Sequence, residues 1–87
     1  MIQYVYPDGK VVKEPNKRFS CNELKRIFGG WFKLQWVFEN ESTDYYMCSM
    51  DTYGKKINEL PEYNKKIKEE FNCDVYGMAI IAPQSMF

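Results

Sequence analysis

The sequence contains no histidine, so the side chain that most often serves as a general base near neutral pH is missing. Its three cysteines, Cys21, Cys48 and Cys73, are spaced too widely for a zinc knuckle, and no histidine is present to complete a zinc site. An odd number of cysteines fits a reducing compartment better than a disulfide scaffold. We therefore expect a protein that is not an enzyme and that carries no metal or cofactor.

Long apolar segments are also lacking. None reaches the roughly 18 consecutive apolar residues that suggest a membrane-spanning helix, and the first ten residues lack the layout of a secretory signal. Twelve basic and twelve acidic side chains cancel, which argues against a protein whose affinity comes from neutralising phosphates. We therefore expect a cytoplasmic protein that binds neither membranes nor nucleic acid.

Large apolar side chains are abundant, since 45% of the residues are hydrophobic and 17% are aromatic. In a chain of 87 residues this is enough for one core, so we expect a single domain over residues 1–87. Charge is unevenly distributed, because residues 1–36 are mainly basic and residues 37–64 mainly acidic. Such a distribution suits a polar partner surface or self-association.

A β-hairpin and a short helix are predicted over the first third of the chain. Pro7-Asp8-Gly9 lies between two β-rich runs, and this residue order is typical of a tight turn. Ser20 and Glu23 match a capping box, which predicts a helix that begins after Ser20. Gly29 lies where a left-handed C-cap belongs. A helix C-terminus repels anions, so we interpret Gly29 and Gly30 as a cap and not as a phosphate site.

An aromatic strand follows in "WFKLQWVF", residues 31–38. Its alternation predicts that Phe32, Leu34, Trp36 and Phe38 form a core face. "DYYMCSM", residues 44–50, reads as a second strand that pairs with it antiparallel.

The last third of the chain predicts a helix and a buried strand. Pro61 is well placed as a first helical residue, and apolar side chains then recur every four residues to Phe71. "DVYGMAIIAP", residues 74–83, is too uniformly apolar for an edge strand, so we place it inside the sheet. Gly77 within it predicts either a bulge or a close backbone approach, the latter from Gly30 or a neighbouring chain. Met86 and Phe87 either fill a gap in their own core or dock on another subunit.

The elements together predict an α+β fold with the order strand, strand, helix, strand, strand, helix, strand. We expect a mixed or antiparallel sheet with both helices on one face.

Three segments resemble a family of small uncharacterised domains found in phages and mobile elements of bacteria. They are "IFGGWFKL" at 27–34, "MDTYGKKINELPEYN" at 50–64 and "VYGMAII" at 75–81. In that family a helix ends in two glycines before a strand, a turn carries Gly-Lys, and the last strand reads xGxaliv. The resemblance covers nearly the whole chain. It implies a fold and a phage setting, and it brings no established chemistry with it.

Exposed aromatic side chains are the main candidates for function. If both helices cover one face of the sheet, the aromatic residues on the other face lie open. Such a surface forms a hot spot for a protein or a stacking platform for a base, and the neutral net charge favours the protein. The predicted partner-binding patch comprises Trp31, Lys33, Tyr45 and Tyr53, with an acidic rim of Glu39, Glu41 and Asp44.

These features predict a small phage or mobile-element accessory protein that acts by binding. Its expected partner is a host protein, such as a defence or regulatory factor, which it inhibits. The alternative is a homo-oligomer that sequesters a small ligand, such as a nucleotide signal, between subunits. In that case aromatic side chains stack on the base, and Lys33, Lys55 or Lys56 contacts the phosphate.

Overall fold

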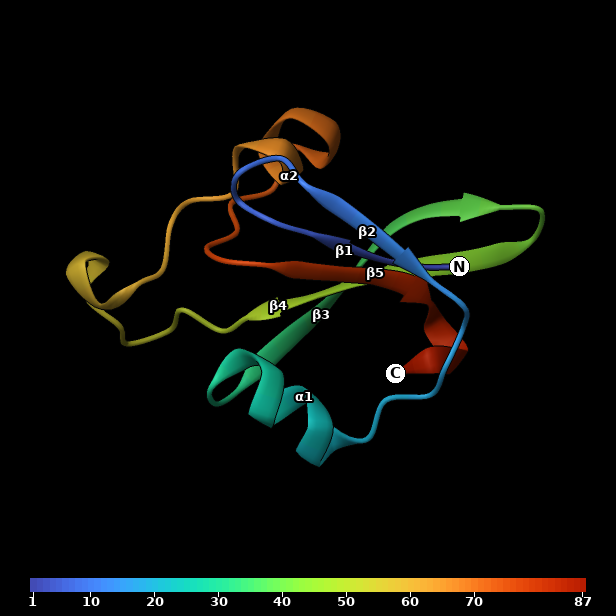
Figure 1. Cartoon of the computed structure of the whole chain (residues 1–87), viewed down its shortest axis with the longest axis horizontal. Coiled ribbons are helices and arrows are strands. Elements are labelled where there is room, and N and C mark those ends of the chain that lie inside the picture. The colour runs from blue at the N-terminus through green and yellow to red at the C-terminus, as the bar shows by residue number, and fades with distance from the viewer.

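Five strands pair antiparallel into one sheet, and an α-helix lies against each face (Figure 1). The computed structural model describes residues 1–87. Its strands are β1 (Ile2–Val5), β2 (Val11–Glu14), β3 (Phe32–Asn40), β4 (Thr43–Met50) and β5 (Ala79–Pro83). Its helices are α1 (Cys21–Phe28), α2 (Lys65–Phe71) and the 3-10 helices η1 (Ile57–Glu59) and η2 (Gln84–Met86). None of them has the length and apolar character needed to cross a membrane.

The strands lie in the order β2-β1-β5-β4-β3, so β5 is central and β3 and β2 are the edges. The strand predicted over residues 74–83 begins only at Ala79. All five residues of β5 are buried, which confirms that this part of the segment lies inside the sheet. The prediction of an α+β fold is also confirmed, and of the two predicted sheet types the antiparallel one is found. β5 carries apolar side chains on both faces and therefore needs a cover on both sides.

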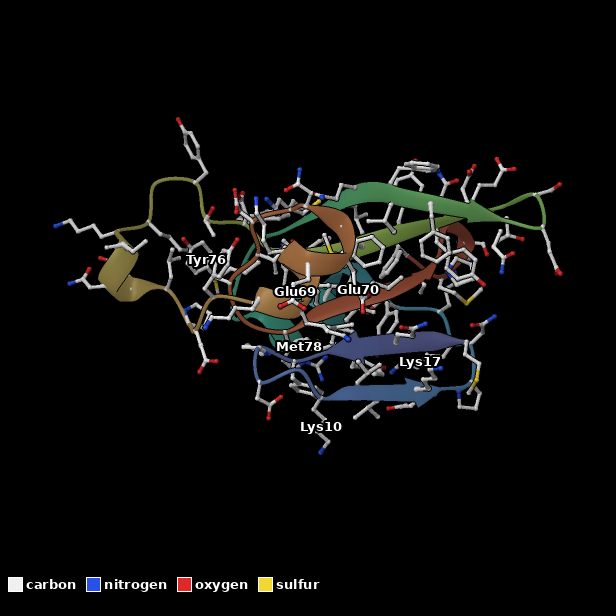
Figure 2. The ribbon with its side chains drawn as sticks, turned by 90° about the horizontal axis from the view of Figure 1, so that it is seen from above. Lys10, Lys17, Glu69, Glu70, Tyr76 and Met78 are labelled. Carbon is white, nitrogen blue, oxygen red and sulfur yellow. The ribbon has the colours of Figure 1, made fainter.

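The prediction that both helices lie on one face is wrong. Ile80 of β5 packs into a cluster with Leu24 and Phe28 of α1. Its neighbour Ile81 points the opposite way and packs into a second cluster with Ile67 of α2. Figure 2 shows α2, with Glu69 and Glu70, in front of the sheet, while α1 lies behind it. We call these two sides the α1 face and the α2 face.

Both ends of α1 form as the sequence predicts. The Ser20 hydroxyl accepts from the Glu23 N–H at 3.1 Å, and the Glu23 carboxylate accepts from the Ser20 N–H at 3.2 Å. Gly29 ends the helix at φ 69°, a left-handed conformation that costs glycine little. Local signals therefore determine both boundaries of this helix.

α2 begins four residues later than predicted, at Lys65, because Asn64 and not Pro61 starts it. The buried Asn64 side chain accepts from the Ile67 N–H at 3.0 Å and caps the helix. Its amide also donates to the carbonyls of Val5 and Gly77, at 3.0 and 2.9 Å. Asn64 thus joins α2 to two segments that are distant in sequence.

A close approach at Gly77 is confirmed, but its partner is Pro61. Gly77 has φ 80°, and a Cβ built on it would lie 3.0 Å from the ring of Pro61. The predicted partner Gly30 is therefore wrong, and the approach comes from within the same chain. Pro61 thus packs against this glycine from the connection that precedes α2.

Candidate protein-binding groove

The edge position of β3 determines which of its aromatic side chains are covered. β3 pairs with β4 from Phe32 to Trp36 in a regular antiparallel register, and a β-bulge at Val37 then shifts it. Beyond the bulge Phe38 lies opposite Tyr45 and packs with the α2-face cluster. The prediction that Phe32, Leu34, Trp36 and Phe38 form one core face is therefore wrong, because the bulge moves Phe38 to the other face.

On the α1 face, cover is confined to the first part of β3. Phe32 packs against the cluster that contains α1, whereas Leu34 is 44% exposed and Trp36 is 54% exposed. α1 has only about two turns, so it does not extend along the nine residues of the strand. Two large apolar side chains are thus left open on one face, next to each other along an edge strand.

A groove with a volume of about 410 Å³ lies beside these two side chains. Its lining residues are Leu34, Tyr46, Gln84, Ser85 and Phe87. Phe87 is held in place by Phe19, since the two rings stack with centroids 5.9 Å apart. The Phe19 N–H also donates to the carbonyl of Met86 at 2.7 Å. Phe87 therefore packs on its own chain and forms one wall of the groove.

The side chains around the groove provide hydrogen-bonding groups but no charge. The Tyr46 hydroxyl, the Gln84 amide and the Ser85 hydroxyl are its polar groups, and its other lining residues are apolar. Cys48, opposite Leu34 on the same face, is fully buried, and burial raises the pKa of its thiol to about 12. A thiol with so high a pKa is a poor nucleophile. Because its lining is uncharged and partly apolar, the groove is suited to hold an apolar side chain.

An acidic rim adjoins the groove at the β3–β4 hairpin. The indole Nε1–H of Trp36 donates to Oδ1 of Asp44 at 3.0 Å. Glu39 lies opposite Asp44 in the register, and Glu41 lies in the turn that connects the strands. All three acidic residues of the predicted rim are exposed and lie at the same end of the sheet. The structure thus places the rim next to Trp36, a residue that the sequence analysis assigned to the core.

Two of the predicted patch residues, Lys33 and Tyr45, lie on the α2 face. Tyr45 is half-buried, and its ring stacks on Phe38 with centroids 4.7 Å apart. Lys33 lies opposite Ser49 in the register. The pKa of the Asp74 carboxyl is lowered mainly by its hydrogen bond from Tyr63, and the charge of Lys33 adds a small part. Lys33 and Tyr45 are separated from the groove by the thickness of the sheet.

The other two predicted patch residues, Trp31 and Tyr53, lie near the start of β3, far from the acidic rim. Trp31 is 65% exposed, and Nζ of Lys25 lies 3.8 Å from its ring centroid in a cation–π contact. Tyr53, in the loop after β4, is 93% exposed. Eight residue steps along β3 separate this end from Asn40, a span of about 26 Å. The seven predicted residues therefore do not form one continuous patch.

The predicted patch includes none of the five residues that line the groove, which are Leu34, Tyr46, Gln84, Ser85 and Phe87, nor Trp36, which lies opposite Tyr46 beside it. The alternation of Leu34 and Trp36 matches that of a covered strand and therefore predicts core positions for both. Gln84 and Ser85 gave no signal, since only the fold brings η2 against β4. The sequence gives one indication of a site at the C-terminal segment. Phe87 is apolar and fits either its own core or the surface of another subunit.

Comparison of the chain with models of protein families, with curated proteins and with solved structures finds no match. The resemblance to small phage domains therefore stays a prediction.

Proposed function

We propose that this chain is a non-enzymatic protein-binding domain, and that its partner docks in the groove on the α1 face. The observation that supports this most is the pairing of an open groove with two exposed apolar side chains, Leu34 and Trp36, on one face of an edge strand. Aromatic side chains that stay partly exposed beside a pocket are the residues that most often dominate protein–protein binding energy.

The chemistry of the surface defines the partner that it fits. The groove accepts an apolar side chain, and the carboxylates of Glu39, Glu41 and Asp44 border Trp36 at the hairpin. A complementary partner segment places an aliphatic or aromatic side chain in the groove and a lysine or arginine against this rim. The partner we propose is a protein segment of this kind.

The proposed biological role is that of a small phage or mobile-element accessory protein which inhibits a host protein by binding it. This setting rests on the resemblance of the three segments named above. Inhibition in this case means that the bound domain covers a functional surface of the host protein, for example in a defence or regulatory factor. The groove supports the proposal that the domain binds a protein. The resemblance supports the proposal that it belongs to a phage or mobile element.

The test is site-specific photocrosslinking in bacterial cells that produce the protein. A photoreactive residue replaces Ser85 at the groove or, as a control, Asn58 in η1, which is also exposed. We expect one protein to crosslink at position 85 and not at position 58, and the crosslink to disappear when Trp36→Ala is added. The crosslinked protein is then purified and its activity measured with and without the domain.

Equal crosslinking from positions 58 and 85 would refute the groove as the binding site. A groove-specific partner whose activity does not change would refute inhibition while leaving binding intact. The alternative function, sequestration of a nucleotide, has less support, because no cation lines the groove. Lys33 lies on the α2 face, and Lys55 and Lys56 lie in the loop after β4.

A further inference from the structure

The outer edge of β3 has unpaired backbone groups. β3 is the last strand of the sheet, and its inner side pairs with β4. The Trp31 carbonyl accepts from the Asp51 N–H at 3.1 Å, so the backbone of residue 31 faces β4. Backbone groups alternate in direction along an antiparallel strand. The N–H and C=O groups of Phe32, Leu34 and Trp36 therefore point outward, to the free edge.

The regular part of β3 is self-complementary about its midpoint. It comprises the five residues Phe32 to Trp36, ends where the bulge begins, and has Leu34 at its centre. We propose that two copies of this chain pair their β3 edges antiparallel, with Leu34 of each copy on the two-fold axis. In this register Leu34 lies opposite Leu34 of the second copy, and Phe32 lies opposite Trp36.

Hydrogen bonding and side-chain direction agree in this register. The three residues whose backbone groups point outward form every hydrogen-bonded pair, which gives about six hydrogen bonds across the axis. Their side chains all lie on the α1 face, because residues two apart share a face of a strand. Phe32, Leu34 and Trp36 of both copies thus join into one apolar strip that covers exposed surface.

Charge also favours this register over its neighbours. With Leu34 on the axis, Lys33 lies opposite Gln35 of the second copy, and no like charges are opposed. Moving the axis to Lys33 would place two lysines opposite each other, which is unfavourable. Moving it to Gln35 would bring Val37, the bulge residue, into the paired segment. An axis at Leu34 avoids both the opposed lysines and the bulge.

The surface that this pairing buries is modest. About half of Trp36 and somewhat less of Leu34 are exposed, so the two supply on the order of 200 Å² of apolar surface per copy. Together with the paired backbone this stays below the roughly 1,200–2,000 Å² of a standard stable interface. We therefore expect a weak dimer whose population rises with protein concentration.

The dimer goes beyond the proposed function, since it uses the free edge of β3. It covers part of Leu34 and Trp36, while Tyr46, Gln84, Ser85 and Phe87 of the groove lie on the side away from the second copy. The strand order places β3 between the groove and the second copy. Two grooves then flank the axis, one on each copy, so that a dimer offers a partner two binding sites.

Sedimentation equilibrium tests the dimer over protein concentrations from about 10 µM to about 1 mM, the range of weak interfaces. We expect the wild type to shift from monomer to dimer mass across this range. Leu34→Lys opposes two positive charges on the axis and should stay monomeric, with circular dichroism confirming that it folds. Gln84→Arg, which fills the groove, should dimerise like the wild type. A wild type that remains monomeric at the highest concentration overturns the proposal.

Disulfide trapping tests the register, in a background in which Cys21→Ser and Cys73→Ser remove the two cysteines that are not fully buried. Cα atoms of a hydrogen-bonded antiparallel pair lie about 5.5 Å apart, within the range of a disulfide. Leu34→Cys should therefore crosslink to itself under mild oxidation. Trp36→Cys should crosslink only when mixed with Phe32→Cys. Equally rapid crosslinking of Leu34→Cys and Trp36→Cys alone would indicate random collision and refute the register.

The two proposals fail separately. Loss of groove-specific photocrosslinking with an intact dimer would refute the proposed function alone. A monomer that still crosslinks its partner at position 85 would refute the dimer alone.

Discussion

The indole of Trp36 donates its Nε1–H to Asp44 Oδ1 at 3.0 Å, across the β3–β4 ladder, while the residue stays 54% exposed. This contact orients a large aromatic side chain on the part of the α1 face that α1 does not cover. A side chain held in one orientation loses less entropy when a partner binds. The Trp36–Asp44 pair therefore links the acidic rim to the groove and prepares both for binding.

Trp36→Ala should weaken partner binding by about 30-fold, the cost of removing a hot-spot aromatic residue. Because Trp36 is half-exposed, the free energy of unfolding should fall by no more than about 1 kcal/mol. Trp31→Ala is the matched comparison, since Trp31 is a similarly exposed tryptophan at the other end of β3. Isothermal titration calorimetry with the identified partner measures the loss of affinity in both variants. A larger loss for Trp31→Ala would support the patch predicted from sequence instead of the groove.

Asn64→Ala should lower the free energy of unfolding by about 3 kcal/mol, because it removes a helix cap and the amide that donates to the carbonyls of Val5 and Gly77. Urea denaturation monitored by circular dichroism measures the change. Asn58→Ala, at an exposed position, should change stability by less than about 0.5 kcal/mol.

Asn64→Asp separates the two roles of this side chain. Aspartate keeps the acceptor for the Ile67 N–H but cannot donate to the carbonyls of Val5 and Gly77. We expect it to be destabilised nearly as much as Asn64→Ala. A stability equal to that of the wild type would mean that Asn64 acts only as a cap.

The β3–β4 turn should become more stable when its two residues are replaced. Glu41 and Ser42 both have positive φ, 50° and 65°, as a two-residue type I′ turn requires. Neither residue favours this conformation, whereas Asn-Gly does. Glu41→Asn with Ser42→Gly should raise the free energy of unfolding by about 1 kcal/mol, measured by urea denaturation. A decrease would show that the Glu41 side chain stabilises the hairpin in another way.

Tyr63 and Asp74 should titrate as a coupled pair. The Tyr63 hydroxyl donates to Asp74 Oδ1 at 2.7 Å, and this hydrogen bond is the main cause that raises the pKa of Tyr63 to about 12. The same bond is the main cause that lowers the pKa of Asp74, and Lys68 adds to it. Asp74→Asn should bring the Tyr63 pKa back toward 10.0, as observed by NMR of the tyrosine ring. Glu69→Gln, an exposed neutralisation on α2, should leave it unchanged.

The pKa shifts of this pair also set the direction of its pH dependence. Because the pKa of Tyr63 is raised, its contribution to stability is complete below pH 10.0 and is lost as the pH rises to about 12. Because the pKa of Asp74 is lowered, its contribution is complete above its ordinary pKa and is lost as the pH falls through the folded value. The difference in stability between wild type and Tyr63→Phe should therefore shrink at both extremes of pH.

Features set by neighbouring residues could be predicted from the sequence. The capping box of Ser20 and Glu23, the Gly29 cap and the Pro7-Asp8-Gly9 turn each depend on residues within a few positions of one another. The central position of residues 79–83 followed from their uniform apolar character. These signals are local or compositional, so the chain alone contains them.

Features set by strand order could not be predicted in the same way. Alternation along β3 is the same for a central strand and an edge strand, so Leu34 and Trp36 read as core although they are exposed. The bulge at Val37 depends on pairing with β4, and it reverses the face of Phe38. The groove arises because η2 folds back beside Tyr46, a contact between segments that are distant in sequence.

The most direct test of the groove is an NMR titration of the labelled protein with two short peptides. Both carry a central tryptophan and leucine, one flanked by lysines and the other by glutamates. With the lysine-flanked peptide we predict amide shifts that cluster at Leu34, Tyr46, Ser85 and Phe87, and much smaller shifts with the glutamate-flanked peptide. Shifts that instead cluster at Lys33 and Tyr45, on the α2 face, or that are equal for both peptides, would contradict the account.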